Sequence, residues 1–352
     1  MLSTQIVMAR RPSGPLTQDD FRTETVAVPE RPADHVLLRT ILVSVAPAAR
    51  AVMQGPTYRP QLQPGEAIPA SVLGEVVAGP PGGPRIGSIV GAAAAWQEYS
   101  TVPVDQTWPI APVGRLSHHL GPLGRNGLTA YFGVSEVGAV QAGQTVLVSG
   151  AAGGVGHLAG QLARAAGARV VGITGSAAKN EFLRDRLGYA AAIDRRSPTF
   201  DDDLKAACPG GVSVYFDTVG GPLLGRVLPV LTRHARIVCC GVTAQYDADR
   251  PLPGPPDLAV TLIAKSLRMQ GFLVADFQPR WAQAQRILHD LEHSGALTFV
   301  EDIRPGLAAA PAALVEMFDG GNVGQLAVRL APDPATWSAG LPTAQDDPSD
   351  AP

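Results

Sequence analysis

A glycine-rich loop between an apolar run and an amphipathic segment most constrains how this chain folds. Residues 145–157 read Thr-Val-Leu-Val-Ser-Gly-Ala-Ala-Gly-Gly-Val-Gly-His. The apolar run predicts a buried strand, and a helix is expected over His157–Ala166, with Leu158, Leu162 and Ala166 on one face. Backbone N–H groups at a helix start, together with the helix dipole, attract an anion. The pattern therefore predicts an α/β domain that binds the pyrophosphate of a dinucleotide.

The loop departs from the strict G-x-G-x-x-G pattern, because Ala151 stands where the first glycine would be. Gly150, one residue earlier, supplies the freedom that the turn requires. Gly153 lets the backbone approach the pyrophosphate, and Gly156 lets the helix pack closely on the strand. The residues of this loop that we expect to bind the cofactor are Ala152, Gly153, Gly154, Val155 and Gly156.

The segment after the next predicted strand indicates which dinucleotide binds. An NAD site places an acidic residue about 20 residues past the loop, but no carboxylate follows this strand. Gly175 and Ser176 leave room for a 2′-phosphate, and Lys179 offers a cation at a helix start. Arg195 and Arg196 follow the third strand and can add bidentate contacts. The alternative is that these cations are ordinary surface residues; the missing acid favours NADP(H).

From about Gly121 onward, apolar runs alternate with helix-like segments, which is typical of a parallel βαβ sheet. Six strands, the number in a doubly wound dinucleotide-binding fold, are expected. They are Thr145–Ser149, Arg169–Thr174, Ala190–Asp194, Val212–Asp217, Ala235–Cys240 and Leu267–Phe272. An amphipathic helix over Trp281–Ser294 closes this region.

The first third of the chain reads as short strands between Pro/Gly turns, with no long helical pattern before about Ser117. After Gly295, two strand-like runs and one helix-like segment are too short for a domain of their own. We expect them to return to the first domain. The predicted organisation is a β-rich, barrel-like domain over 1–121 completed by 296–332, a dinucleotide-binding domain over 122–295, and a disordered acidic tail over 333–352.

The charge balance and the cysteine count exclude several classes of protein. In 352 residues, 28 Lys and Arg stand against 31 Asp and Glu, which leaves no positive field for nucleic acid. Three cysteines cannot form a disulfide framework or a four-thiolate zinc site. No apolar run approaches the ~20 residues of a membrane span, and the first eleven residues lack the apolar stretch of a signal peptide. We expect a soluble, cytoplasmic protein.

Several sequence blocks occur together in the order and at the intervals of a known family. They are 126–133, 148–156, 215–221, 245–246 and 321–324. In combination they resemble the prostaglandin reductase and alkenal double-bond reductase branch of the zinc-independent medium-chain dehydrogenases/reductases, from about Val26 to Leu330. The resemblance implies a GroES-like β-rich catalytic domain, completed by C-terminal strands after an inserted Rossmann domain, usually in a homodimer. It also implies NADPH-dependent reduction of the carbon–carbon double bond of α,β-unsaturated aldehydes and ketones, by hydride transfer to the β-carbon.

The resemblance assigns single residues to the cofactor and to the substrate. Thr129 and Asn322 would flank the nicotinamide, and Lys179 would hold the 2′-phosphate. Tyr246 is similar to a tyrosine beside the substrate carbonyl, and Tyr58 to one at the pocket mouth. Without the resemblance, Tyr246 reads as a residue that packs a loop after the fifth strand. The residues expected to line the rest of the cofactor cleft are Thr218, Cys240, Gly241 and Phe272.

Some positions depart from the family pattern. The family's Asp-Pro-Tyr-Met-Arg run is here Ala46-Pro-Ala-Ala-Arg50, an adenine-side tyrosine appears as Arg195, and a common lysine as Gln325. Arg50 is either a pocket residue or an ordinary surface cation, and the surface cation is favoured. The alternative functions are an NADPH quinone or carbonyl reductase, a redox-neutral enzyme of the same fold, and an NADP-binding protein without catalysis.

We expect no metal site. The run Leu73-Gly74-Glu75 lacks the histidine of a zinc alcohol dehydrogenase. The run His289-Asp-Leu-Glu-His293 matches the H-x-x-E-H metalloprotease pattern but is better explained by an amphipathic helix. His118 and His119 are expected in a polar linker between the domains.

Overall fold

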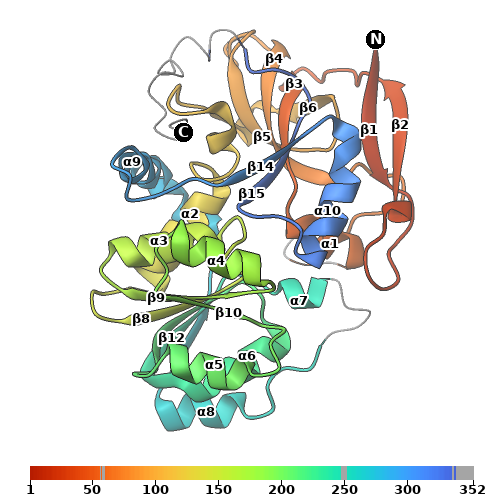
Figure 1. The fold of residues 1–352 in the computed structure, drawn as a ribbon. Helices are drawn as coiled ribbons and strands as arrows, with labels where there is room; N and C mark the ends of the chain where they lie inside the picture. Colours follow the sequence, from red (N-terminus) through yellow and green to blue (C-terminus); the bar gives the residue numbers. More distant parts are fainter. Residues whose placement is uncertain (56, 58–59, 247–251, 335–336, 338–352) are drawn as a thin grey trace, which may run out of the picture.

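Two large sheets form the framework of the molecule (Figure 1). The computed structural model describes residues 1–55, 57, 60–246, 252–334 and 337. One sheet has six strands from the middle of the sequence, and the other has seven strands from both ends of the chain. A separate antiparallel pair, β1 (Leu2–Met8) and β2 (Phe21–Ala27), lies beside the seven-stranded sheet.

The six-stranded sheet is parallel throughout, in the order β10-β9-β8-β11-β12-β13. Counted along the chain this is 3-2-1-4-5-6, the strand order of a doubly wound dinucleotide-binding domain, so the predicted Rossmann fold is confirmed. Its strands are β8 (Thr145–Ser149), β9 (Arg169–Thr174), β10 (Ala191–Asp194), β11 (Val212–Asp217), β12 (Leu231–Cys239) and β13 (Arg268–Gly271). The bounds of β8, β9 and β11 are those predicted from the apolar runs.

Helices cover both faces of this sheet because its strands are apolar on both sides. On β8, Val146 and Val148 pack with Leu158 of α3 in one core cluster, and Leu147 between them belongs to the cluster on the other face. The helices are α2 (Arg125–Phe132), α3 (Gly156–Ala165), α4 (Ala177–Asp185), α5 (Phe200–Ala207), α6 (Gly221–Val227), α7 (Thr243–Tyr246), α8 (Leu258–Lys265) and α9 (Trp281–His293).

The seven-stranded sheet joins strands that lie far apart in the sequence. Its order is β14-β15-β3-β4-β5-β7, with β6 paired to β3. The strands are β3 (His35–Ser44), β4 (Pro69–Ala78), β5 (Ile89–Ala95), β6 (Tyr99–Pro103), β7 (Thr107–Pro109), β14 (Glu301–Pro305) and β15 (Gln325–Arg329), and α10 (Ala310–Asp319) connects the last two. Because β15 pairs antiparallel with β3, the end of the chain completes the β-rich, GroES-like domain. The exact domain limits stay a prediction.

Two sequence-based expectations, which concern three polar residues, were wrong. Arg50 is not a surface cation but fully buried on α1 (Pro47–Gln54), where its Nη2 donates to the Gly14 carbonyl at 2.9 Å. His118 and His119 are not in a polar linker, because both are buried in a short 3-10 turn. Their rings pack edge-on against Phe299 and Trp337. A guanidinium or imidazole can be buried when a carbonyl accepts its proton or a ring covers it.

No helix within the described ranges has the length and apolar character needed to cross a membrane. Most of the predicted tail over 333–352 lies outside the described residues. Trp337, a described residue of that tail, is buried, and its indole N–H donates to the Gly114 carbonyl at 3.2 Å.

Candidate active site

The glycine-rich loop lies at the point where the strand order of the parallel sheet reverses. β8 and β11 are neighbours there, and ligands of such sheets bind beyond the carboxyl ends of the strands. Gly150, directly after β8, has φ +56°, and a Cβ on it would lie 2.5 Å from Thr218 Oγ1. Thr218 Oγ1 donates to the Ser149 carbonyl at 2.8 Å. The turn that leaves β8 therefore packs directly on the end of β11, as only glycine allows.

The loop has a closed side and an open side. A Cβ on Gly156 would lie 2.2 Å from the Gly150 carbonyl oxygen, so α3 packs against the loop without space for a side chain. At Gly153 a Cβ would meet only that same oxygen, at 3.2 Å. The open side at Gly153, next to the start of α3, is a cradle that a side chain would fill. This geometry fits a pyrophosphate bound by backbone N–H groups.

Two arginines lie beside Gly175, where the sequence predicts the 2′-phosphate, and Lys179 is close enough to feel their charges. A Cβ on Gly175 would lie 3.4 Å from Arg195 Nε and 3.7 Å from Arg196 Nε. Lys179 lies in the first turn of α4, where Ser176 is the N-cap residue and accepts from the Lys179 N–H. Burial first, and then the charges of Arg196 and Arg195, lower the pKa of Lys179. Because the three charges repel one another, a bound phosphate would relieve an unfavourable arrangement.

Asn322 connects this cationic cluster to the glycine-rich loop. Its backbone carbonyl accepts from Lys179 Nζ at 2.6 Å, and its side-chain amide donates to the Gly324 carbonyl at 3.2 Å. The Gly324 N–H in turn donates to the Ala152 carbonyl at 2.8 Å. A segment of the β-rich domain thus touches both predicted parts of the cofactor site.

Helix α2 borders the same loop and carries Thr129. Its residue Asn126 donates to the side-chain oxygen of Gln325, and a Cβ on Gly154 would lie 2.6 Å from Asn126 Nδ2. Thr129 is half-buried one turn further along the helix, and its hydroxyl donates to the Arg125 carbonyl at 2.7 Å. The structure therefore places Thr129 on a helix that contacts the loop.

The remaining predicted cleft residues follow neighbouring strands. The N–H groups of Cys240 and Gly241 donate to the Asp217 carbonyl at 2.8 and 3.1 Å, which holds the ends of β11 and β12 together. Burial, and then the Asp217 carboxylate, raise the pKa of Cys240 to about 12, so its thiol is neutral at neutral pH. Phe272 follows β13 and packs near Gly133, where a Cβ would lie 3.0 Å from its ring.

The two predicted substrate tyrosines have different outcomes. Tyr246 is the last residue of α7, is half-buried, and lies on a helix that packs against α1 (Figure 1). Since α1 contains most of the Ala46–Arg50 run, the structure brings the helix that carries Tyr246 to the segment where this chain departs from the family pattern. Tyr58 lies outside the described residues.

Sequence reasoning missed a buried carboxylate at the centre of the site. Asp217 Oδ1 accepts four hydrogen bonds, from the Ser149 and Tyr215 hydroxyls at 2.8 and 2.9 Å and from the Val219 and Gly220 N–H groups at 3.0 and 2.9 Å. It thereby fixes the turn after β11. The position of Asp217 at the carboxyl end of a predicted central strand could have indicated this role from the sequence.

Sequence reasoning also missed two polar residues, His157 and Gln161, that connect α3 to residues 298–300. His157 is fully buried; its Nδ1 lies 2.8 Å from the Gly153 carbonyl, and its Nε2 accepts from the Val300 N–H at 3.4 Å. Gln161, one turn later, exchanges two hydrogen bonds with the backbone of Thr298. Burial lowers the pKa of His157 to about 4, and the neutral Nδ1–H tautomer satisfies both contacts. In the sequence, two polar residues spaced four apart on an otherwise apolar helix face could have indicated this contact.

The H-x-x-E-H run lies on α9, where the rings of His289 and His293 stack at 6.3 Å. Within the described part of the chain, no group of three or more His, Cys, Asp or Glu is arranged to hold a metal ion.

Comparisons with known proteins agree with this architecture. Residues 4–110 match the family described as the N-terminal domain of oxidoreductase, and residues 154–290 match the zinc-binding dehydrogenase family. YfmJ of Bacillus subtilis (strain 168) is 40% identical, over 94% of this chain and 98% of its own length. The NADP(+)-dependent 2-alkenal reductase of Nicotiana tabacum is 33% identical, over 93% and 97%.

Among solved structures, the NADPH complex of CurA from Vibrio vulnificus superposes with a TM-score of 0.88 at 30% identity, covering 94% of this chain and 100% of that one. The strand order, the completed β-rich sheet and full-length relatives at 33–40% identity lead to one conclusion. The chain belongs to the zinc-independent branch of the medium-chain dehydrogenases/reductases.

Proposed function

We propose that this protein reduces the carbon–carbon double bond of α,β-unsaturated aldehydes and ketones with NADPH. The observation that carries the proposal is the cationic cluster of Lys179, Arg195 and Arg196, in which the two arginines lie beside Gly175 and Lys179 is joined through Asn322 to the glycine-rich loop. The similarity to an alkenal reductase supports the conjugated carbonyl as the substrate class.

The cofactor prediction has independent support. A structural neighbour at 30% identity was solved with NADPH, and the alkenal reductase is named for NADP(+), so the predicted NADP(H) is confirmed for the family. The local geometry fits, because Gly153 leaves an open cradle for the pyrophosphate and Gly175 leaves room beside two arginines. The bound cofactor would supply the hydride that the β-carbon of the substrate receives.

The protein's own contribution is to orient the nicotinamide and to stabilise the negative charge that develops on the substrate. We assign Thr129 and Asn322 to hold the nicotinamide from two sides of the crevice. As the β-carbon gains a hydride, negative charge develops on the carbonyl oxygen of the substrate. A hydrogen-bond donor at that oxygen lowers the barrier because the bond is strongest in the transition state. Tyr246 is the donor in this proposal, and the α-carbon then takes a proton that exchanges with water.

The test is NADPH consumption with a panel of enals, enones, quinones and saturated aldehydes. We expect turnover of enals and enones with NADPH, weak turnover with NADH, and a saturated carbonyl product. Consumption with quinones alone would instead identify a quinone reductase. Tight NADPH binding without oxidation by any carbonyl would identify a binding protein, and product formation without net oxidation a redox-neutral enzyme.

We also propose a homodimer. β13 is the edge of the six-stranded sheet and is exposed along its length, and α8 beside it exposes Val260 and Ile263. An exposed edge with apolar neighbours pairs readily with another copy of itself. Light scattering of the wild type should give twice the chain mass, and Ile263→Glu should shift the protein toward a monomer.

A further inference from the structure

Two polar side chains from distant parts of the chain meet beside the glycine-rich loop. Asn126 is the second residue of α2, and Gln325 is the first residue of β15. The side-chain amide of Asn126 donates a hydrogen bond to the side-chain oxygen of Gln325. Because the two residues are 199 positions apart, this hydrogen bond joins the helix that borders the loop to the strand that completes the β-rich domain.

Gln325 is held in one orientation by its neighbours. The residue is buried, and its backbone N–H donates to the Val300 carbonyl at 2.8 Å. Its side-chain N–H group donates to the Leu326 carbonyl at 2.9 Å, which leaves the side-chain oxygen to accept from Asn126. A Cβ on Gly121 would lie 2.6 Å from Gln325 Cγ, so the side chain has no free space on that side. The oxygen that accepts from Asn126 is therefore fixed in position.

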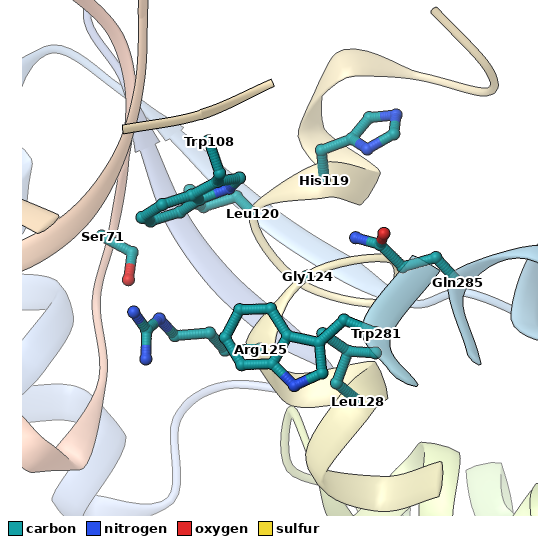
Figure 2. A pocket seen from close by; sticks show the side chains of 9 residues that line it. All are labelled: Ser71, Trp108, His119, Leu120, Gly124, Arg125, Leu128, Trp281 and Gln285. Carbon is teal, nitrogen blue, oxygen red and sulfur yellow. The ribbon is translucent and has the colours of Figure 1, made fainter. Parts of the chain in front are cut away.

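The start of α2 is fixed as well, by the residue before Asn126. The guanidinium carbon of Arg125 lies 5.5 Å from the ring centre of Trp108 and 5.9 Å from that of Trp281. Figure 2 shows these three side chains lining one narrow hollow, with Trp108 on β7 and Trp281 on α9. Cation–π contacts with two rings orient the guanidinium and hold this end of the helix in place. Both partners of the Asn126–Gln325 hydrogen bond are thus fixed by further contacts.

The hydrogen-bonded pair packs against Gly154 of the glycine-rich loop. A Cβ on Gly154 would lie 2.6 Å from Asn126 Nδ2 and 3.3 Å from Gln325 Oε1. The preceding residue, Gly153, is the open position of the loop, where a Cβ would meet only the Gly150 carbonyl oxygen. The pair therefore supports the loop directly beside the position expected to receive the pyrophosphate.

Backbone contacts extend this support along the loop. The Gly324 N–H donates to the Ala152 carbonyl at 2.8 Å, and Gly153 and Gly324 form an isolated parallel β-bridge. Residues 152–154 of the loop are therefore all in contact with residues 324–325 or with Asn126. Glycine allows many backbone conformations, so the shape of a loop built from small residues depends on what surrounds it.

We infer that Asn126 and Gln325 are positioning residues for the cofactor. Their hydrogen bond holds the loop at Gly154 in the shape in which its N–H groups bind the pyrophosphate, and neither side chain needs to touch the cofactor. Removing either partner leaves the polar group of the other without its hydrogen bond, which favours movement of the loop or entry of water. This role concerns cofactor binding, so it does not depend on which carbonyl compound the protein reduces.

The test compares ligands that contain the pyrophosphate with one that lacks it. Calorimetry measures the dissociation constants of NADPH, NADH and adenosine 2′-phosphate for the wild type and for Gln325→Met, which keeps the length of the side chain and removes the acceptor. We expect the constants for NADPH and NADH to rise by the same factor, about tenfold, because one hydrogen bond that positions the pyrophosphate site is lost. The constant for adenosine 2′-phosphate, which has no pyrophosphate, should not change.

A double-mutant cycle tests the pair itself. Asn126→Ala removes the donor at a half-buried helix position, so it serves the test even when Gln325→Met folds poorly. Each single variant and the double variant should weaken NADPH binding to the same extent, because each lacks the same hydrogen bond.

The control is Gln97→Met in the β-rich domain, which removes a side-chain hydrogen bond of 2.7 Å to Ser100 Oγ. NADPH should bind to this variant as to the wild type. Wild-type NADPH affinity in either single variant, additive effects in the double variant, or equal weakening of all three ligands would overturn the inference.

Discussion

The two sides of the candidate site are built from different kinds of chemical groups. On the side of the six-stranded sheet, the site consists of backbone groups and glycines at strand ends, and the loop is shaped by Gly150, Gly153 and Gly156. On the opposite side, α1, which begins at Pro47, packs against α7, the short helix that ends at Tyr246. The shape of the first side depends on the strand order and on glycines, which have no side chain. The shape of the second side depends on the side chains that meet where the two domains come together.

This difference predicts how the two sides respond to substitution. A backbone cradle depends on the strand order and on a few glycines, so it changes little when other residues change. A pocket between domains depends on every contributing side chain, so single substitutions such as those in the Ala46–Arg50 run alter it.

The largest effect is expected from a methyl group on the closed side of the loop. In Gly156→Ala the new Cβ would meet the Gly150 carbonyl oxygen at 2.2 Å, and backbone on both sides must move. We expect a loss of about 3 kcal/mol in the free energy of unfolding, measured with denaturant, and no NADPH binding. In the control Gly210→Ala no atom lies within 4 Å of the new Cβ, so stability should change by less than about 0.5 kcal/mol. Normal NADPH affinity in Gly156→Ala would contradict the packing described for α3.

The next effect is the loss of folding stability on acidification, caused by His157, which connects α3 to residues 298–300. The folded protein holds His157 with a pKa near 4, against an ordinary value of 6.5. Between these pH values the unfolded chain binds the proton more strongly, so the contribution of His157 to stability is complete above about pH 6.5 and is lost as the pH falls toward 4. The shift corresponds to about 3 kcal/mol.

The check is the pH dependence of unfolding in His157→Gln, compared with the wild type. The variant should be less stable at pH 7 and should lose less stability on acidification, because the titrating group is gone. The exposed His293 on α9 provides the control, and His293→Gln should keep the wild-type slope. Equal slopes in His157→Gln and the wild type would show that other groups, such as His118 with its lowered pKa, cause the acid sensitivity.

The same contrast separates what could be predicted from the sequence from what could not. The strands of the parallel sheet were predictable because each is an apolar run of the right length, and β8, β9 and β11 have the predicted bounds. The cationic cluster was predictable because the residues after parallel strands meet at one edge. The burial of Arg50 and the stacking of Arg125 between two indoles depend on contacts between residues far apart in the sequence, and no local pattern indicates them.

A smaller effect on the cofactor side is expected from Lys179→Met. The substitution removes one of the three cations of the cluster and the contact to Asn322. The dissociation constant for NADPH should rise about 30-fold, because one charged hydrogen bond to the 2′-phosphate is lost, and that for NADH should hardly change. Fluorescence titration measures both, and Lys205→Met, an exposed lysine on α5, is the control. An equal loss for NADPH and NADH would mean that Lys179 acts through Asn322 rather than through the phosphate.

The smallest effect is expected on the substrate side, from Tyr246→Phe. The phenol is half-buried on α7, so water can replace part of the hydrogen bond to the carbonyl oxygen, and kcat should fall about tenfold. The dissociation constant for NADPH should not change, because the lost donor acts on the charge of the substrate that develops during hydride transfer. A matched substitution at a tyrosine away from the crevice, Tyr99→Phe on β6, should leave kcat unchanged. If kcat of Tyr246→Phe equals that of the wild type, the donor comes from elsewhere in the crevice, and the substrate side then owes its chemistry to residues other than those that the resemblance indicates.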